Sequence, residues 1–369
     1  MKILYVTTVG GTMSFFELLI KKLIGEGHSI DIATNESVSK VPDCYRQFGC
    51  RILPISCTRS PLNKGSFLAI KELERIVAEN SYDIVHCHTP IAAFCTRVAC
   101  RKARKQGLRV FYTAHGFHFH KGAPMKNWMI FYPIEKLCAR WTDALITINQ
   151  EDYQRACKKL KAKKVYYVPG VGVDLCAFRN VTVDRETVRR ELGIPMDATV
   201  LLSVGELNDN KNQQAVIRAM SRVESQNIHY LIAGVGPSRE QLSRLAKDHG
   251  LSDRVHLLGY RTDVSQLCHV ADVFCFMSYR EGLGIAAIEA MASGLPIITS
   301  NVHGINDYSE NGVTGYKCAP SDVEAIARAI NDLDTHPEQR RMMGEYNEKL
   351  VERYDVNVIN EQMKKIYNV

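Results

Sequence analysis

Two glutamates, Glu281 and Glu289, have seven residues between them and enclose a glycine-rich turn and an Ala/Ile-rich segment that predicts a helix. The start of a helix presents unpaired backbone N–H groups and the positive end of the helix dipole, which suits a phosphate. A carboxylate on either side can accept hydrogen bonds from the hydroxyl groups of a sugar or a ribose. Two acids at this spacing can also flank an ordinary core helix. Gly282 and Gly284 favour a site for a sugar nucleotide.

A lysine and two glycines lie in turns after expected strands of the same half of the chain. Lys211 follows the strand expected at 199–204, where its ammonium could reach a diphosphate at the sheet edge, although a loop lysine taken alone is more often simply exposed. Gly234 and Gly236 also lie between a strand and a helix, but they form only part of a dinucleotide-binding pattern. They gain weight because they share a domain with the two glutamates.

The first half of the chain offers a glycine turn and a histidine. Gly10 and Gly11 follow a strand and precede a helix, but they lack the full G-x-G-x-x-G pattern, so a tight turn and a ligand loop both remain open. His115 comes directly after the strand expected at 110–113 and is followed by a glycine. Ligands bind at the carboxyl edge of such sheets, which favours a functional role for His115.

Metal binding is not indicated by the histidines and cysteines. His118 and His120 are close to His115 in the chain, but no nearby acid or cysteine completes a ligand set. The twelve cysteines contain no CxxC pair and lie mostly in apolar runs, which is typical of a reducing compartment. We therefore expect no metal, no cofactor and a cytoplasmic protein. The cysteines expected to be small buried hydrophobes are Cys87, Cys95, Cys100, Cys138 and Cys275.

The chain alternates apolar strands with helical patterns, which predicts parallel sheets with helices on both faces. Strands are expected in the first half at 3–8, 29–34, 51–55, 84–87, 110–113 and 144–148. A helix with apolar residues at Phe15, Leu18, Leu19 and Leu23 is expected after the first strand. The pattern begins again near residue 198, with strands expected at 199–204, 230–233, 255–258, 273–276 and 297–300.

The fold predicted from this repetition is α/β, with two doubly wound, Rossmann-like domains that face each other across a cleft. The turn-rich passage from Pro169 to Asp174 marks the junction. The first domain is expected at residues 1–172 and the second at 173–355. A terminal helix is expected over 356–367, within a segment 356–369 whose docking site its own pattern does not reveal.

Charge is distributed unevenly along the chain. Residues 1–180 hold 27 Lys and Arg against 14 Asp and Glu, a net charge of +13, whereas the remainder carries a net charge of −6. A basic first half attracts anions, such as nucleic acid, an anionic membrane face or a lipid diphosphate, although clusters such as Arg101–Lys105 can also be solvated surface. No apolar stretch approaches the roughly 20 residues needed to cross a bilayer. The first residues enter a strand directly, without the pattern of a signal peptide.

An aromatic passage from Trp128 to Trp141 has two interpretations. With Lys121, Lys126 and other nearby cations it could form an interfacial membrane contact. Pro133 and the acidic Glu135 interrupt a continuous interfacial face, so a core helix is the preferred interpretation.

Taken together, these motifs resemble those of the family-4 retaining glycosyltransferases, whose two Rossmann-like domains face a cleft. The resemblance covers nearly the whole chain. Its carriers are the first strand with Gly10-Gly11, His115-Gly116, Pro169 to Asp174, the Lys211 loop, Gly234-x-Gly236-Pro237 and Glu281-x7-Glu289. The passage Gly170 to Asp174 is also similar to that of enzymes that build bacterial surface polysaccharides.

The resemblance implies roles for these residues. Glu289 would hold the ribose hydroxyls, Glu281 would hold sugar hydroxyls, and the amides of Gly284 and Ile285 would lie near the diphosphate. Lys211 would neutralise the departing diphosphate. His115 would touch the donor sugar from the opposite domain, and the terminal helix would cross back to the first domain.

One residue departs from the family pattern. The family usually has an arginine just after the glycine that follows the strand at 199–204, but this chain has Glu206. An acid there would repel a diphosphate. Arg280 and Arg261 are the candidates to supply the missing charge, and Arg280 is included among the expected donor-binding residues.

The function that the resemblance implies is transfer of a sugar from a nucleotide-diphosphate sugar, with retention at the anomeric carbon. The resemblance favours UDP as the nucleotide. The acceptor expected is a glycan or a polyprenyl-diphosphate-linked sugar, because the basic first domain suits an anionic membrane face. The leaving phosphate can take the proton of the acceptor, so neither a carboxylate base nor a metal is required. Nucleic acid is not an expected partner. A nucleotide-sugar epimerase and a non-catalytic sugar-nucleotide-binding protein remain alternatives.

Overall fold

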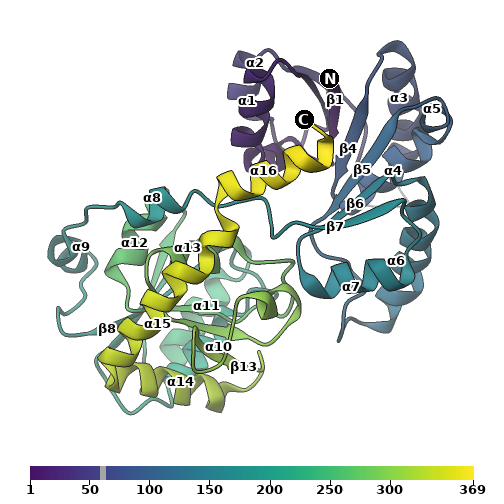
Figure 1. The fold of residues 1–369 in the computed structure, drawn as a ribbon. Coiled ribbons are helices and arrows are strands. Elements are labelled where there is room, and N and C mark those ends of the chain that lie inside the picture. Colours follow the sequence, from purple (N-terminus) through teal and green to yellow (C-terminus); the bar gives the residue numbers. More distant parts are fainter. Residues whose placement is uncertain (59–63) are drawn as a thin grey trace. The chain divides into compact units, whose positions relative to one another are not determined.

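The computed structural model of the chain describes residues 1–58 and 64–369, whose contacts divide it into two units. Unit 1 comprises Met1–Val171 and Ile359–Val369, and unit 2 comprises Gly172–Val358. Each unit contains one parallel sheet accompanied by helices (Figure 1). This architecture confirms the α/β fold of two Rossmann-like domains expected from the sequence.

The sheet of unit 1 has seven strands in the order β3-β2-β1-β4-β5-β6-β7, and all neighbours are parallel. The strands are β1 (Lys2–Val6), β2 (Ser29–Thr34), β3 (Arg51–Pro54), β4 (Ile84–His88), β5 (Arg109–Ala114), β6 (Ala144–Thr147) and β7 (Lys164–Tyr167). The strand order changes direction between β1 and β4. This is the switch point at which ligands bind in such sheets.

The helices of this part of the chain cover both faces of its sheet. They are η1 (Gly10–Phe15), α1 (Glu17–Gly25), α2 (Cys44–Gln47), α3 (Lys64–Glu79), α4 (Pro90–Ala99), α5 (Arg101–Arg104), α6 (Met125–Cys138), η2 (Ala139–Trp141), α7 (Gln150–Lys159) and α16 (Val356–Tyr367). On β1, Leu4 and Val6 pack with α3 and α4, whereas Ile3 and Tyr5 pack with α1 and α16. This alternation follows from the two-residue period of a strand.

The last turn of α16 is held to the sheet of unit 1 by hydrogen bonds. The Tyr367 hydroxyl is 2.6 Å from the Tyr5 hydroxyl and 2.5 Å from Nδ1 of His86. Its ring stacks on Phe111, with 5.8 Å between ring centres. The bounds of α16 agree with the helix expected from the sequence, and these contacts supply the docking site that its own pattern could not reveal.

The sheet of unit 2 has six parallel strands in the order β10-β9-β8-β11-β12-β13. The strands are β8 (Thr199–Val204), β9 (Ile228–Ala233), β10 (Val255–Gly259), β11 (Val273–Phe276), β12 (Ile297–Ser300) and β13 (Gly315–Cys318). The helices are α8 (Leu175–Arg179), α9 (Arg185–Glu191), α10 (Gln213–Met220), α11 (Arg239–Asp248), α12 (Val264–Val270), α13 (Ile285–Ala292), η3 (His303–Asp307), α14 (Val323–Thr335), α15 (Pro337–Leu350) and η4 (Val351–Tyr354). The switch point lies between β8 and β11.

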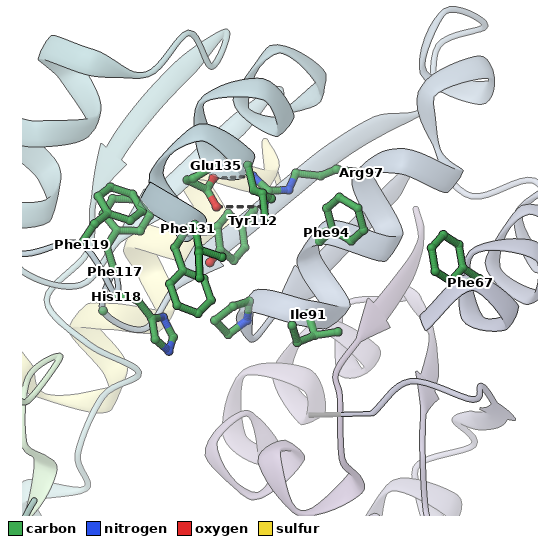
Figure 2. Close-up of a pocket in the computed structure, with 14 residues that line it drawn as sticks. Phe67, Ile91, Phe94, Arg97, Tyr112, Phe117, His118, Phe119, Phe131 and Glu135 are labelled. Carbon is green, nitrogen blue, oxygen red and sulfur yellow. Dashed lines mark hydrogen bonds and ion pairs between the residues drawn. The ribbon is translucent and has the colours of Figure 1, made fainter. Parts of the chain in front are cut away.

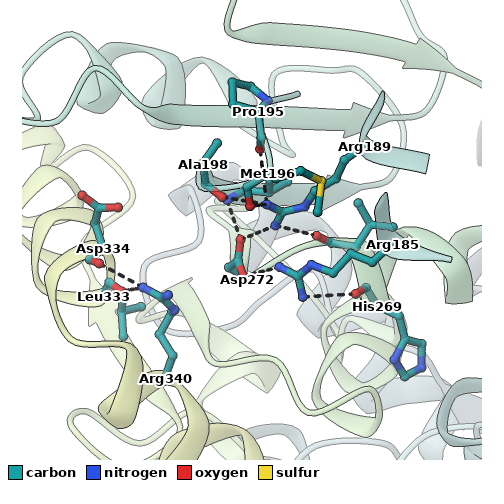
Figure 3. Close-up of polar contacts among 12 residues, drawn as sticks. Arg185, Arg189, Pro195, Met196, Ala198, His269, Asp272, Leu333, Asp334 and Arg340 are labelled. Carbon is teal, nitrogen blue, oxygen red and sulfur yellow. Dashed lines mark hydrogen bonds and ion pairs between the residues drawn. The ribbon is translucent and has the colours of Figure 1, made fainter. Parts of the chain in front are cut away.

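A buried arginine ties α9 to the body of unit 2 (Figure 3). Arg189 donates to the carbonyl oxygens of Met196 and Ala198, each at 2.9 Å, and to the Asp272 carboxylate at 2.8 Å. The same carboxylate accepts from the backbone of Val200 at 2.8 Å and from Arg185 at 2.5 Å. The charge is thus paired and hydrogen-bonded, as burial requires.

Several sequence expectations differ from the observed elements. Gly10 and Gly11 begin a 3-10 helix instead of a simple turn. Phe15 and Leu18 are about half exposed, and Ile20 takes a place in the core beside Leu19. The helical pattern expected at Phe15, Leu18, Leu19 and Leu23 is thus divided, with Phe15 in the 3-10 helix η1 and the three leucines in α1. The five cysteines expected to be buried are confirmed as buried.

Candidate active site

Lys211 and Glu281 form an ion pair in unit 2, with 2.5 Å between Nζ and Oε1. Lys211 lies in the loop after β8 and Glu281 in the loop after β11, so both stand at the switch point of the sheet. The two loops are joined where Asn210 accepts from the backbone N–H of Tyr279 at 2.8 Å and donates to the Arg280 carbonyl at 3.0 Å. The fold therefore places a cation and a carboxylate together at the edge where ligands bind.

The start of α13 lies directly after this pair. Gly284 is the residue before the helix and has φ of 91°, a left-handed conformation that favours glycine. A Cβ there would lie 2.5 Å from the Phe276 ring and 3.0 Å from the Tyr308 hydroxyl. The amides of Ile285 and Ala286 come before the first hydrogen bond of this turn, in which Ala287 donates to the Gly284 carbonyl at 3.1 Å, and they form an anion-binding end.

Glu289 lies on α13, one turn after its start, and is only partly accessible. Burial raises the pKa of its carboxyl to about 7. A carboxyl in this state can accept hydrogen bonds from a pair of hydroxyl groups once it is ionised. Glu289 therefore has the chemistry expected of a ribose ligand.

Gly234 and Gly236 have a packing role in the structure. A Cβ at residue 234 would lie 1.9 Å from the Gly205 carbonyl oxygen, and one at residue 236 would lie 2.3 Å from that of Leu207. The two glycines thus allow the loop after β9 to pack on the loop after β8, which carries Lys211. Their expected contact with a ligand stays a prediction.

Glu206, which replaces the arginine usual in the family, and the two arginines that could compensate for it differ in their contacts. Glu206 is exposed and accepts from the Asn208 side chain at 2.9 Å. Arg261 is paired with Asp263 through two hydrogen bonds of 2.7 and 2.5 Å, so its charge is already neutralised. Within the described residues, Arg280 forms no ion pair, and it lies in the loop after β11, directly before Glu281. Arg280 is thus better placed than Arg261 to supply a second cation.

In unit 1, His115 belongs to a cluster of aromatic and imidazole rings after β4 and β5. Its Nε2 is 3.2 Å from Nδ1 of His88, whose ring is stacked on Tyr5 at 5.5 Å between ring centres. Burial lowers the pKa of His115 to about 4 and that of His86 to about 3, and the pKa of His88 is also lowered well below its usual value. These rings are neutral at neutral pH, so His115 can act as a hydrogen-bonding group but not as a cation.

Gly10 and Gly11 are also explained by packing. A Cβ on Gly10 would lie 2.5 Å from the Ser39 carbonyl oxygen, and one on Gly11 would lie 2.5 Å from the Ser39 hydroxyl. The backbone N–H of Gly10 donates to that carbonyl at 3.0 Å. The glycines let the chain after β1 pass close to the segment around Ser39, and their contact with a ligand stays a prediction.

The sequence reasoning missed Thr89, which follows β4. It has φ of 65°, a strained conformation for a β-branched residue, and its hydroxyl lies 2.6 Å from that of Thr8. Thr8 and Thr89 both line a cavity of about 290 Å³ at the switch point between β1 and β4. The available signal was the Thr-Pro pair directly after a buried strand, which places a hydroxyl at the start of a helix.

Helix α6 packs one face on the core of unit 1 through Trp128, Phe131 and Tyr132, as the preferred interpretation expected, and exposes its other face. Met125 and Met129 are more than 70% exposed, and Ile130, Ile134 and Leu137 are also exposed. Glu135 does not interrupt this surface, because it is buried in an ion pair with Arg97 of α4, at 2.5 and 3.0 Å. The chain thus presents an apolar helix surface to solvent. No described helix is long and apolar enough to span a membrane.

Two family models together match most of the chain. The model described as Glycosyltransferase Family 4 matches residues 9–175, and the one described as Glycosyl transferases group 1 matches residues 184–350. The first match falls almost entirely in unit 1 and the second within unit 2.

Curated relatives align along nearly the whole length. A putative glycosyltransferase, EpsD of Bacillus subtilis, is 36% identical over 373 aligned positions, which cover 100% of this chain and 96% of the relative. An Escherichia coli protein is named UDP-Gal:alpha-D-GlcNAc-diphosphoundecaprenol alpha-1,3-galactosyltransferase. It is 27% identical over 363 aligned positions, which cover 95% of this chain and 91% of that protein.

Solved structures share the fold. HepE of Anabaena in complex with UDP aligns with a TM-score of 0.83 at 20% identity, over 100% of both chains. WaaG, a glycosyltransferase involved in lipopolysaccharide biosynthesis, aligns with a TM-score of 0.77 at 20% identity, over 99% of both chains. These likenesses confirm the GT-B type of fold.

Proposed function

Since the chain belongs to the glycosyltransferases, with a family 4 domain followed by a group 1 domain, we propose that it moves a hexosyl or N-acetylhexosaminyl group from a UDP-sugar with retention at the anomeric carbon. The observation that carries this proposal is the Lys211–Glu281 pair beside the start of α13. A UDP-sugar offers a diphosphate and hydroxyl groups side by side, and this site offers a cation with helix amides beside a carboxylate.

The proposed binding mode divides the ion pair between the two parts of the donor. The diphosphate accepts hydrogen bonds from the ammonium of Lys211 and from the amides of Gly284 and Ile285. The sugar hydroxyls donate to Glu281, and the ribose hydroxyls donate to Glu289. His115 serves as a neutral hydrogen-bonding group for the donor sugar, and Gly10, Gly11, Gly234 and Gly236 shape the loops.

In the proposed reaction, the bond between the anomeric carbon and the diphosphate oxygen breaks, and the acceptor oxygen bonds to that carbon on the same face. The acceptor proton goes to the departing phosphate, so no carboxylate base is needed. Charge grows on the leaving oxygens, and donors already aimed at that position lower the barrier. Lys211 and Arg280 supply the positive charge that stabilises these oxygens, without a metal.

The acceptor proposed is a glycan or a sugar linked to polyprenyl diphosphate, in the synthesis of a surface polysaccharide. Support comes from the net charge of +13 over residues 1–180, which attracts an anionic acceptor. The Escherichia coli relative is named for such an acceptor. We also propose that the protein works in the cytoplasm, bound peripherally to the anionic membrane face through α6, whose exposed methionines and isoleucines adjoin Lys126 and Lys136.

The test is incubation with a panel of nucleotide sugars, with and without a lipid extract containing polyprenyl-linked sugars. Acceptor-dependent release of UDP is the expected result. An isomerised donor without transfer would instead identify an epimerase. Binding without turnover of any donor would identify a non-catalytic binding protein.

A further inference from the structure

Two cavities of unit 1 adjoin each other and differ in chemistry. The first, of about 290 Å³, is lined at the switch point by the side chains of Thr8, Thr12 and Thr89. The second, of about 200 Å³, lies between α4, α6 and the segment after β5 (Figure 2). The residues that line both cavities are Pro90, Ile91, His118 and Phe131. The rings of His118 and Phe131 stack at 4.4 Å between centres and form part of the shared wall.

The second cavity has a predominantly apolar lining. Phe94, Phe117 and Phe119 contribute to its wall, together with Ile91 and Phe131. Its charged groups, Arg97 and Glu135, already satisfy each other, and Arg97 also donates to the Ala93 carbonyl at 2.9 Å. Such a wall offers water few hydrogen-bond partners. An apolar cavity of about 150 Å³ can stay dry and accept an apolar molecule. The chemistry favours a hydrocarbon occupant.

The rim of this apolar cavity is open to apolar molecules from solution. Phe67 of α3 is 67% exposed, and Ile130 of α6 is 51% exposed, and both line the cavity. The same helix α6 carries the exposed cations Lys126 and Lys136. An apolar chain with an anionic head matches this combination of surfaces.

We propose that the two cavities hold a single amphiphilic acceptor, with its sugar-bearing head among the threonines and the first part of its hydrocarbon chain among the phenylalanines. This inference rests on the proposed function and adds to it a binding place for the lipid chain. The strained Thr89 marks the boundary, since it places its hydroxyl at the head compartment and is followed by Pro90 of the shared wall.

The test uses the intrinsic fluorescence of Trp128. Its ring lies 5.7 Å from that of Phe119, a wall residue, between ring centres. The second tryptophan, Trp141, stacks on Arg101 and is removed by Trp141→Phe. A brominated twelve-carbon alkyl phosphate, kept below its micelle concentration and without vesicles, should quench Trp128 saturably, whereas inorganic phosphate should not.

Two substitutions on α6 separate the cavity from the exposed helix surface. Ile134→Lys places a charge in the cavity wall at a position that is 37% exposed and should weaken probe binding at least tenfold. Met129→Lys, at an exposed position outside the wall, should leave binding within twofold. Equal effects of both substitutions, or quenching that requires vesicles, would overturn the inference in favour of a membrane-surface contact.

Transfer assays keep this inference distinct from the proposed function. The wild-type enzyme should prefer a diphosphate-linked sugar with a long chain over a chainless one, and Ile134→Lys should lose that preference through a higher KM. Sugar transfer without a preference for the long-chain acceptor, together with no quenching, would contradict the chain-binding site but not the proposed transferase activity. Saturable quenching without release of UDP in the presence of any acceptor would contradict the proposed transferase activity but not the lipid-binding site.

Discussion

The ammonium of Lys211 lies 2.5 Å from the carboxylate of Glu281, and the two residues come from loops separated by 70 positions in the chain. The sheet order brings them together, because β8 and β11 are neighbours at the switch point. Lys211 also lies 4.8 Å from the centre of the Phe276 ring. A cation already fixed in this way can meet a diphosphate with little reorganisation.

Glu281→Gln should separate sugar recognition from nucleotide recognition. The change removes the charge that accepts from sugar hydroxyls and releases Lys211 from its partner. We expect the affinity for a UDP-sugar to fall about tenfold relative to the affinity for UDP, since hydrogen bonds to charged groups contribute about 1.5–3 kcal/mol. Titration calorimetry with both ligands measures this ratio. An unchanged ratio would show that Glu281 does not touch the sugar.

Glu289 should make nucleotide affinity depend on pH. The pKa of its carboxyl is raised to about 7 by burial, so the carboxylate that accepts from ribose forms as pH rises from 6 to 8. UDP affinity of the wild type should therefore increase over this range. Glu289→Gln removes the titration and serves as the control for ionisation of the phosphate. Parallel pH profiles for the two proteins would contradict the ribose assignment.

The same group predicts the pH dependence of stability in the ligand-free protein. The folded carboxyl holds its proton up to about pH 7, whereas the unfolded one releases it near 4.5. The folded state therefore binds more protons between these values, and the contribution of Glu289 to stability decreases as pH rises through this window. Urea denaturation of wild type and Glu289→Gln at pH 5 and pH 7.5 should show that the wild type loses more stability relative to the variant.

Arg97 and Glu135 predict a stability effect away from the donor site. Both side chains are buried, and the pair joins α4 to α6. Glu135→Ala leaves the guanidinium without its partner and should cost about 3–5 kcal/mol in the free energy of unfolding. Glu345→Ala, which breaks an exposed pair with Arg341, should cost less than about 1 kcal/mol. Chemical denaturation compares the two, and similar losses would contradict the role of the buried pair.

Met129 offers a test of membrane contact through α6. Its side chain is 71% exposed, so Met129→Lys should preserve folding. Sedimentation with vesicles that contain anionic lipid should show weaker association for this variant than for wild type. Met342→Lys, at a 65% exposed position on α15, is the matched control. If the wild type does not bind these vesicles at low salt, the proposed membrane contact through α6 is contradicted.

The sequence predicted the strands of both sheets where apolar runs are long. Thr199–Val204 and Ile297–Ser300 are buried throughout or nearly so, and their bounds agree with expectation. It did not predict β7 and β13, because Lys164–Tyr167 and Gly315–Cys318 are four-residue edge strands with charged members. Their pairing depends on a neighbouring strand and not on their own pattern.

Parts of the candidate sites depend on contacts that no local pattern contains. Glu281 and Lys211 stand in recognisable turns and Glu289 on the helix that follows, so their placement at a sheet edge could be predicted. The exposed surface of α6 could not, because its orientation is set by Arg97, distant in the chain from Glu135. The apolar cavity likewise collects residues from Phe67 to Glu135.

The most direct measurement of the central claim is acceptor-dependent UDP release by the wild type, Lys211→Ala and Lys247→Ala. Lys247 lies exposed on α11 and serves as the matched lysine control. The account predicts a turnover lower by about 10²–10³ in Lys211→Ala, as for loss of a donor to a developing oxyanion, and wild-type turnover in Lys247→Ala. Equal turnover in all three proteins would contradict the claim that Lys211 stabilises the departing diphosphate.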